Sequence, residues 1–333
     1  MSEIKVSVIG LGYIGLPTAS LIASKGVKVN GYDNNEDVIN NIHKLSIDEN
    51  EPSLIKMTSK VLNNKQLYVS TNLISANFYI ITVPTPLKII DKKRVPDVSF
   101  VFQAIDEIVK LLKPNDTIIL ESTCPPGTTE NIYKSISQQI SFINLINIAY
   151  CPERILPGNL LNELQNNDRI VGGINNRSSK KAKEFYKIFC NGNIHQSNSL
   201  TAELVKLAEN SYRDVNIAFA NSLSLIAEKS SIPVNDIIKL SNFHPRVNIL
   251  QSGIGVGGHC IPVDPWFLID KYPDETKLLS EARKINDFKT NYVLNFIMDK
   301  IDSYEVKYNK KPSIICLGLS YKVDSNDLRE SPA

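Results

Sequence analysis

A glycine-rich turn near the N-terminus restricts what the first half of this chain can fold into. The segment VIGLGYIGLP places Gly10, Gly12 and Gly15 in G-x-G-x-x-G spacing, directly after a β-branched run and directly before a helical pattern. In this context the first glycine permits a tight turn, the second lets the backbone approach a pyrophosphate, and the third lets the helix pack on the strand. The pattern predicts a strand–turn–helix unit that binds a dinucleotide, although glycines in such a turn can also be purely structural.

The end of the second predicted strand indicates which dinucleotide would bind. The run VKVNGYD ends at Asp33, at the separation from the glycine turn that is typical of dinucleotide-binding units. A carboxylate at this place accepts hydrogen bonds from ribose hydroxyls and repels a 2′-phosphate. We therefore expect NAD rather than NADP as the cofactor.

Strand-like and helix-like segments alternate from residue 4 to about residue 195. The strand-like runs are IKVSVIG, VKVNGYD, LYVST, FYIITVP, TIILEST, NIAYCPE and RIVGG. Such alternation is typical of βαβ units on a parallel sheet, so we expect an α/β fold with a Rossmann-type, doubly wound NAD-binding domain over residues 1–197. Thr85 in VPTP and Thr123 in ESTCPPG follow strands, at the edge of the sheet where open α/β sheets bind ligands. They either contact the ligand or only form turns.

The residue pattern changes near Ser197. A long run ending at Lys229 contains neither glycine nor proline, which predicts one long helix in a central helical domain over residues 198–305. After a further helical segment, PSIICLGLSYK is typical of the first strand of another α/β unit. One strand cannot bury a face by itself, so we expect residues 306–333 to be the start of a second α/β domain that is mostly missing.

Composition and charge exclude several classes of protein. Lys and Arg number 37 and Asp and Glu number 35, so the net charge of +2 indicates neither a nucleic-acid partner nor a membrane surface. No apolar stretch approaches the ~20 residues that span a bilayer, and the N-terminus has no basic signal region, so we expect a cytoplasmic protein. The cysteines are far apart and form no C-x-x-C pair, which indicates neither a disulfide framework nor a metal site; they are Cys124, Cys151, Cys190, Cys260 and Cys316.

Three polar residues share one face of the predicted long helix. Lys206, Asn210 and Arg213 are spaced i, i+4 and i+7. Such a stripe is usually a solvated face, but apolar residues, including Leu204 and Leu207, flank this one closely. A lysine in apolar surroundings can also take part in acid–base chemistry or hold an oxyanion.

The segment GVGGHCIPVDPW, residues 255–266, holds a lone cysteine in a glycine-rich run. Such a cysteine is usually a structural thiol. Metal binding is disfavoured, because the adjacent residues His259 and Cys260 rarely point at one ion. A Cys–His hydrolase would need a partner from a distant position in the chain. Beside NAD, however, a thiolate can add to an aldehyde, and the thiohemiacetal can lose hydride to give a thioester. Asp264 either orients a water or the lysine, or caps the turn before Pro265.

Taken together, these motifs resemble those of the UDP-glucose/GDP-mannose dehydrogenase family. The matching segments are VIGLGYIGLPTA, VPTP, EST, NIAYCPERILPG, NDRIVGG, TAELVKLAENSYRDVNIAFANSLSLI, HPRVNILQSGIGVGGHCIPVDPWF and DLRESPA. Arg154 in YCPER and the GGHC form are most similar to the branch of the family that acts on UDP-N-acetylhexosamines. The resemblance implies four-electron oxidation of UDP-N-acetyl-D-mannosamine at C6 with two NAD, for surface polysaccharide synthesis, with UDP-N-acetylglucosamine or another UDP-hexose as the alternative substrate.

The resemblance also implies roles for individual residues. Cys260 would carry the thiohemiacetal and thioester, Lys206 would move the proton and stabilise the oxyanion with Asn210, and Glu153 and Asp264 would activate water. The cofactor would bind at Gly10, Gly12, Tyr13, Ile14, Gly15, Asp33, Thr85, Thr123 and Arg329. The UDP-sugar would bind at Arg154, Ile155, Lys206, Asn210, Arg213, His244, Arg246, Gly257, Tyr321 and Lys322. His244 and Arg246 would reach the neighbouring subunit of a homodimer built around the long helix.

Two hypotheses from other classes stay open. Because the family's second α/β domain binds UDP, a chain with only its first strand would be an NAD-binding subunit with impaired catalysis. A thiol hydrolase based on Cys260 is the other alternative, and it would not require NAD.

Overall fold

The structure, a computed structural model, describes residues 4–47, 51–155, 159–321 and 328–333. It comprises two units, Met1–Lys206 and Leu207–Ala333. Within the described ranges, no helix combines the length and the apolar character that a membrane crossing requires.

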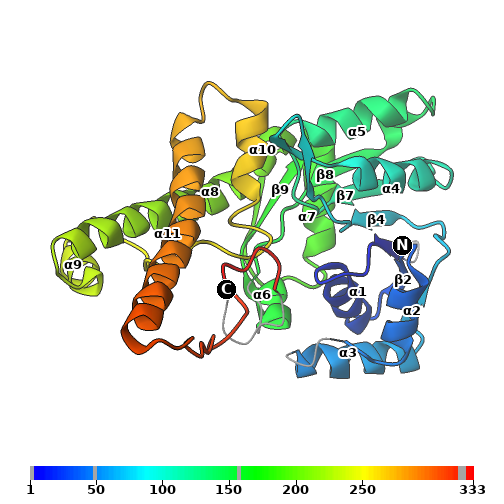
Figure 1. Cartoon of the computed structure of the whole chain (residues 1–333). Coiled ribbons are helices and arrows are strands. Elements are labelled where there is room, and N and C mark those ends of the chain that lie inside the picture. The colour runs from blue at the N-terminus through cyan, green and yellow to red at the C-terminus, as the bar shows by residue number, and fades with distance from the viewer. Residues whose placement is uncertain (1–3, 48–50, 156–158, 322–327) are drawn as a thin grey trace. The chain divides into compact units, whose positions relative to one another are not determined.

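An eight-stranded sheet forms the core of the first unit (Figure 1). Its strands are β1 (Lys5–Ile9), β2 (Lys28–Tyr32), β3 (Leu67–Ser70), β4 (Phe78–Ile81), β7 (Thr117–Leu120), β8 (Asn147–Tyr150), β9 (Arg169–Gly173) and β10 (Ile194–Asn198). The spatial order is β10-β9-β8-β7-β4-β1-β2-β3. From β3 to β8 this is the doubly wound order of a Rossmann fold, which confirms the predicted α/β class.

One pairing in this sheet differs from the prediction. β9 was expected to be parallel like the rest, but it runs antiparallel to β8, while β10 then pairs parallel to β9. The helix between β8 and β9, α6 (Leu160–Asn166), has seven residues and a length of about 10 Å. β9 therefore begins at the edge of the sheet where β8 ends, as antiparallel neighbours do.

Helices cover both faces of the sheet, which explains why its central strands are continuous apolar runs. All residues of β4, β7 and β8 are buried. One face packs against α1 (Gly15–Ser24), α2 (Glu36–His43), α3 (Pro52–Asn63), α6 and α7 (Asn176–Tyr186). The other face packs against α4 (Ser99–Val109) and α5 (Thr128–Ser137).

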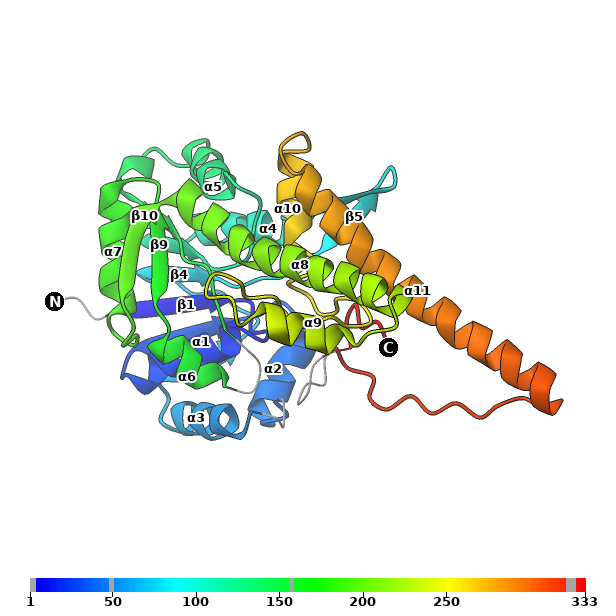
Figure 2. The same ribbon diagram turned by 90° about the vertical axis from the view of Figure 1, so that its left-hand side faces the viewer.

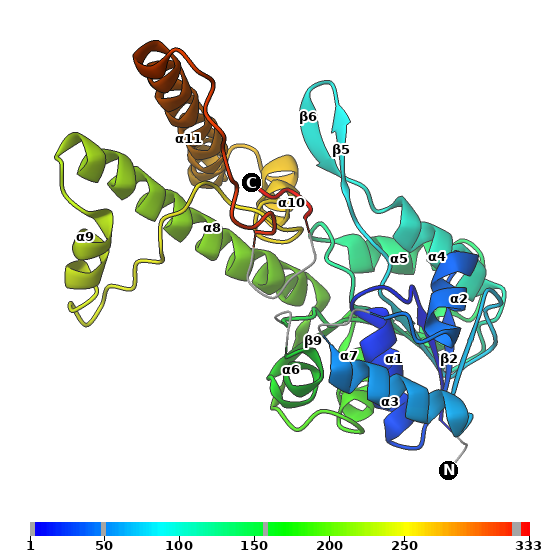
Figure 3. The same cartoon turned by 60° about the horizontal axis from the view of Figure 1, so that its bottom comes forward.

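A small hairpin outside the main sheet was not predicted. β5 (Leu87–Ile90) and β6 (Lys93–Pro96) pair antiparallel and project away from the rest of the unit (Figure 3). The two residues between them, Asp91 and Lys92, both have positive φ, as a two-residue type I′ hairpin turn requires. Lysine is not a usual residue for such a turn, so the sequence signal is weak.

Helices make up the regular structure described in the second unit. α8 (Ser199–Lys229) begins in the first unit and continues here, followed by α9 (Val234–Ser241), α10 (Asp264–Lys271) and α11 (Lys277–Tyr308) (Figure 2). The long uninterrupted helix and the central helical region are confirmed. Asp214 of α8 and Arg283 of α11 form a buried ion pair at 2.6 Å, and Asn286 donates to the same carboxylate at 2.8 Å.

The prediction of a strand within PSIICLGLSYK is wrong. Residues 311–321 contain no strand, and Leu317 is 92% exposed. No neighbouring strand in the described part of the chain offers a ladder of hydrogen bonds, and an unpaired strand has no means of satisfying its backbone groups.

Candidate active site

The glycine turn has the shape of a dinucleotide site. Gly10 has φ +91°, and a Cβ at Gly15 would overlap the carbonyl oxygen of Gly10, so both are fixed by the protein itself. A Cβ at Gly12 would meet nothing within 4 Å. The absence of a side chain at Gly12 therefore leaves open space beside the backbone, where a pyrophosphate can approach closely.

The first turn of α1 adds hydrogen-bond donors to this space. Ile14 occupies the N-cap position, and no side chain caps the helix there. The N–H groups at the start of a helix, together with its dipole, favour a phosphate. Tyr13 is half-buried against the core of the unit.

The carboxylate of Asp33 is held at the edge of the turn. Its Oδ2 accepts a hydrogen bond from the N–H of Leu11 at 2.8 Å, and its Oδ1 accepts from the N–H of Asn35 at 3.0 Å. The Asp33 carboxylate is thus fixed at the end of β2, where it can accept from ribose hydroxyls. Thr85 and Thr123 follow β4 and β7 and are half-buried. These residues fit the adenosine and pyrophosphate parts of NAD.

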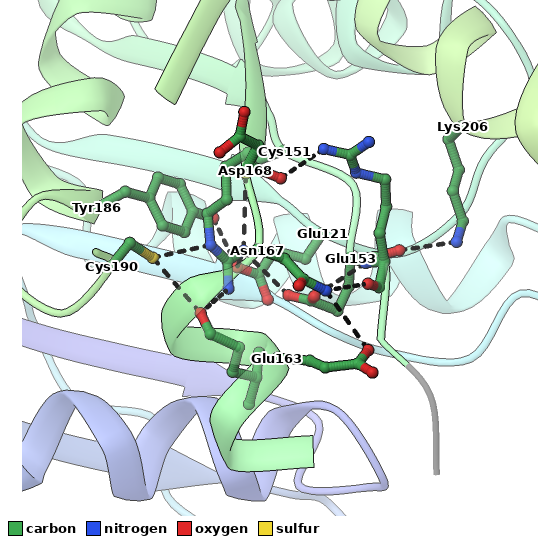
Figure 4. A network of polar contacts seen from close by, with 12 residues as sticks. Glu121, Cys151, Glu153, Glu163, Asn167, Asp168, Tyr186, Cys190 and Lys206 are labelled. Carbon is green, nitrogen blue, oxygen red and sulfur yellow. Dashed lines mark hydrogen bonds and ion pairs between the residues drawn. The ribbon is translucent and has the colours of Figure 1, made fainter. Parts of the chain in front are cut away.

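Glu153 and Lys206, which the sequence placed in one catalytic set, are in contact (Figure 4). The Lys206 Nζ donates to the backbone carbonyl of Glu153 at 2.7 Å. The Glu153 side chain is buried, with Oε1 accepting from the N–H of Arg154 at 2.8 Å. The Arg154 guanidinium donates to the carbonyl of Asp168, and Ile155 packs on the sheet core.

Sequence reasoning missed two residues in the protein interior, one that contacts Glu153 and one that lies beside the first. Arg169, the first residue of β9, forms an ion pair with Glu153 at 2.9 Å and lies 3.9 Å from Glu121. Glu121 comes from the EST motif after β7. Arg169, Glu153 and Glu121 are separated in the chain, so no local motif links them. The sequence indicates them only by their positions at the ends of strands.

The second unit assembles another group of the expected residues. Asn210 of α8 donates to the Oδ2 of buried Asp264 at 2.6 Å. The N–H of Asp264, at the start of α10, donates to the carbonyl of Cys260 at 2.8 Å. The half-buried Cys260 is therefore linked by one turn to an acid and an amide.

The glycines before Cys260 are explained by a neighbouring segment in the same unit. A Cβ at Gly257 would overlap the side chain of Tyr321, and the N–H of Gly258 donates to the carbonyl of Arg329 at 3.1 Å. The Arg329 guanidinium lies 3.0 Å from the ring nitrogen of His259. Tyr321 and Arg329 thus lie next to the cysteine segment.

Other expected residues lie elsewhere or cannot be placed. Arg213 on α8 is exposed, and His244 and Arg246 lie in an exposed turn after α9, where the N–H of Arg246 donates to His244 at 3.3 Å. Lys322 lies outside the described residues. Among the residues that are described, no group of three or more His, Cys, Asp or Glu side chains is arranged to hold a metal ion.

A doubly wound sheet with this glycine turn is typical of a dinucleotide-binding protein. Residues 4–190 match the NAD binding domain of the UDP-glucose/GDP-mannose dehydrogenase family, and residues 200–288 match its central domain. The chain belongs to this family. It is a dehydrogenase with NAD as its cofactor, which confirms the resemblance, the class of enzyme and the cofactor expected from the sequence.

Relatives and solved structures agree with this assignment. The chain is 46% identical to UDP-N-acetyl-D-mannosamine dehydrogenase of Campylobacter jejuni, covering 99% of this chain and 81% of that protein. It is 43% identical to NDP-N-acetyl-D-galactosaminuronic acid dehydrogenase of Ralstonia solanacearum, covering 98% and 78%. The structure of the UDP-D-ManNAc dehydrogenase of Pyrococcus horikoshii superimposes with a TM-score of 0.90 at 38% identity, covering 99% and 79%.

Proposed function

We propose that this chain oxidises the C6 alcohol of UDP-N-acetyl-D-mannosamine to a carboxylate and reduces two NAD. The observation that carries this proposal is the cluster of Asn210, Asp264 and Cys260 in a chain of an NAD-dependent family. A thiol linked to a hydrogen-bonded acid suits a covalent acyl intermediate and its hydrolysis. The likeness to UDP-N-acetyl-D-mannosamine dehydrogenases, at 46% identity in one case, supports the choice of substrate.

The first oxidation gives an aldehyde. The residues that would hold the cofactor are those of the glycine turn, Asp33, Thr85, Thr123 and Arg329, and the bound nicotinamide accepts a hydride in each oxidation. Lys206 takes the proton of the C6 hydroxyl as the hydride leaves. Its positive charge and Asn210 then stabilise the oxygen anion that forms when Cys260 adds to the aldehyde.

The second oxidation passes through Cys260. Its sulfur adds to the aldehyde carbon, and the oxygen takes a proton, which gives a thiohemiacetal. Loss of a second hydride and of the hydroxyl proton gives the thioester. Glu153 and Asp264 then orient and deprotonate a water, whose attack breaks the carbon–sulfur bond and returns Cys260 as a thiol. The balance is alcohol, water and two NAD to carboxylic acid, two NADH and two protons.

The remaining contacts of the substrate and the setting of the enzyme are part of the same proposal. Arg154, Arg213 and Arg246 supply cationic donors for the diphosphate, with Ile155, His244, Gly257, Tyr321 and Lys322 completing the substrate site. Exposed apolar side chains on α8, including Phe219 and Ile226, support a homodimer built around this helix. The five cysteines of the chain are free, as suits a cytoplasmic enzyme that supplies surface polysaccharide synthesis.

The test is turnover of the purified chain with UDP-N-acetyl-D-mannosamine and NAD. We expect two NADH for each sugar acid, and none from a Cys260→Ala variant. Cys316→Ala, which removes an exposed cysteine, is the matched control and should turn over normally. Full activity of Cys260→Ala would exclude the thioester route.

Parallel assays separate the alternatives. Faster turnover of UDP-N-acetylglucosamine or of another UDP-hexose would replace the proposed substrate. Calorimetry that detects NAD binding but no UDP-sugar binding would instead indicate an NAD-binding subunit without catalysis. Hydrolysis of a thioester substrate without NAD would favour the thiol hydrolase.

A further inference from the structure

A single buried arginine serves two buried carboxylates at one edge of the main sheet (Figure 4). Arg169 lies between Glu121, which follows β7, and Glu153, which follows β8. The exposed fractions of the three residues are 3%, 4% and 8%. With both carboxylates ionised, this group would carry one uncompensated negative charge away from water, which is an expensive arrangement.

Contacts with other residues fix the position of the Arg169 guanidinium between the two carboxylates. Its Nε donates to the sulfur of Cys190 at 2.9 Å, and its NH2 group donates to the carbonyl of Leu164 at 3.1 Å. Its plane lies over the ring of Tyr186, 4.8 Å from the centroid. These contacts fix Arg169, so the two carboxylates share its charge in place.

Glu121 is the carboxylate that changes its charge near neutral pH. Burial raises its pKa to about 7, opposed by Arg169 and reinforced by Glu153. Its Oε1 accepts from the Tyr186 hydroxyl at 2.6 Å, while its Oε2 has no hydrogen-bond partner among the described residues. An oxygen without a donor is better tolerated on a protonated carboxyl than on an anion.

Several charged and titratable groups face Glu121 or its arginine. They are Arg169 from β9, Tyr186 from α7, and Cys151 and Glu153 from the segment after β8. Cys190, from the segment after α7, faces Arg169. Burial raises the pKa of Cys151 to about 12, and burial also raises the pKa of Tyr186 and of Cys190. These three side chains are therefore neutral at pH 7, and the charge balance rests on the arginine and the two glutamates.

Glu153 connects this buried group to the site. Its backbone carbonyl accepts from Lys206, and its side chain accepts from the N–H of Arg154, two residues that the proposed reaction uses. The strength of the ion pair between Arg169 and Glu153 therefore influences the Glu153 carboxylate, which is the group proposed to activate water.

We propose that Glu121 is a positioning residue that acts on Glu153 through Arg169 and so controls thioester hydrolysis. When Glu121 is neutral, Arg169 pairs with Glu153 alone, and the Glu153 carboxylate is a weak base. When Glu121 is charged, it shares the guanidinium, and Glu153 becomes a stronger base towards water. The inference rests on the proposed function, since it assumes that Glu153 activates the water.

The kinetic test compares the wild type with Glu121→Gln, which keeps the volume and the acceptor for Tyr186. With UDP-N-acetyl-D-mannosamine and NAD, the kcat of the wild type should rise through a midpoint near pH 7. Glu121→Gln should lack this rise and be about three- to tenfold slower on the alkaline side. In a Glu153→Gln background the same substitution should have no further effect, because there is no longer a carboxylate to control.

A second readout does not depend on turnover. In carbon-13 NMR of protein labelled at its glutamate carboxyls, one resonance should titrate near pH 7 and be absent from Glu121→Gln. In Glu153→Gln its midpoint should fall by about one pH unit or more, because Arg169 then serves Glu121 alone. His195→Gln, which breaks the exposed pair between His195 and Asp168 next to Arg169, should change neither measurement.

The outcomes separate the two proposals. A wild type that turns over no UDP-hexose refutes the proposed function, and the NMR titration still tests the coupling. If the wild type turns over, the inference is overturned by a rise near pH 7 that survives in Glu121→Gln. It is equally overturned by an unchanged Glu121 midpoint in Glu153→Gln, or by equal effects of Glu121→Gln with and without Glu153.

Discussion

Replacing Glu121 by glutamine should change how the stability of the first unit depends on pH. The pKa of Glu121 is about 7 in the folded chain because of burial, against an ordinary value of 4.5. Between these two pH values the folded state holds a proton that the unfolded state has released. The contribution of Glu121 to the free energy of unfolding is therefore fully present below pH 4.5 and is lost as the pH rises towards 7.

The size of the effect follows from the width of this window. Each pH unit in which the folded state binds one more proton than the unfolded state lowers the free energy of unfolding by about 1.4 kcal/mol. From pH 4.5 to about 7 the wild type should lose ~3 kcal/mol through Glu121. Glutamine binds no proton, so the Glu121→Gln variant should escape this loss and gain stability relative to the wild type as the pH rises.

Urea unfolding followed by circular dichroism at pH values between 4.5 and about 8 measures both curves. The titrating groups that do not contact Arg169 or Glu121 are common to both proteins and cancel in the difference. Glu107→Gln provides the matched control, because Glu107 pairs with Lys110 at the exposed surface of α4. Parallel stability curves for the wild type and Glu121→Gln would refute the reasoning, since they would mean that Glu121 titrates equally in both states.

Three further predictions concern the turn and two other buried contacts. Gly12→Ala should fold normally but bind NAD at least about tenfold more weakly, as measured by calorimetry. Gly15→Ala should instead lower the melting temperature in thermal unfolding, because its Cβ would overlap the backbone of Gly10. Arg283→Met should cost about 3–5 kcal/mol in urea unfolding, because it leaves Asp214 buried and unpaired. Glu203→Gln should cost about 1.5–3 kcal/mol in the same measurement, because the buried Glu203 carboxylate accepts from two N–H groups at the start of α5, and an amide cannot accept from both. Unchanged unfolding midpoints would contradict these last two predictions.

Most of the fold could be predicted because it rests on local signals. Apolar runs separated by helical patterns identified seven strands of the main sheet and the long helix α8. β10 was missed because the sequence IHQSN is mostly polar and exposed, as suits a strand at the edge of a sheet. The strand expected after α11 failed for the opposite reason: its residues have strand propensity, but pairing decides whether a strand forms.

The candidate site could be predicted only where residues share a motif or one helix face. The glycine turn and Asp33 were recognised from their spacing, and the structure joins them through the N–H of Leu11. Arg169 and Glu121 are distant in sequence, and an arginine at the start of a strand carries no local mark of burial. Only the packing of β7 beside β8, and of β8 beside β9, brings their side chains together.

A comparison of the two buried arginines shows why the one at the sheet edge indicates function. Arg283 pairs with one fully buried carboxylate, Asp214, and the amide of Asn286 donates to the same carboxylate oxygen, Oδ1. Its other acid, Asp287, is partly exposed and keeps its hydration. The buried charges of that pair cancel, so a structural role accounts for it.

Arg169 has two buried carboxylates, and their charges cannot cancel while both are ionised. For stability alone, a glutamine at position 121 would still accept from Tyr186 and would avoid the excess charge. The second glutamate therefore lowers stability at neutral pH and adds only one property that glutamine lacks, a proton that can leave. A buried group with this composition is suited to changing its charge beside a reacting site, and that property is what the Glu121→Gln measurements test.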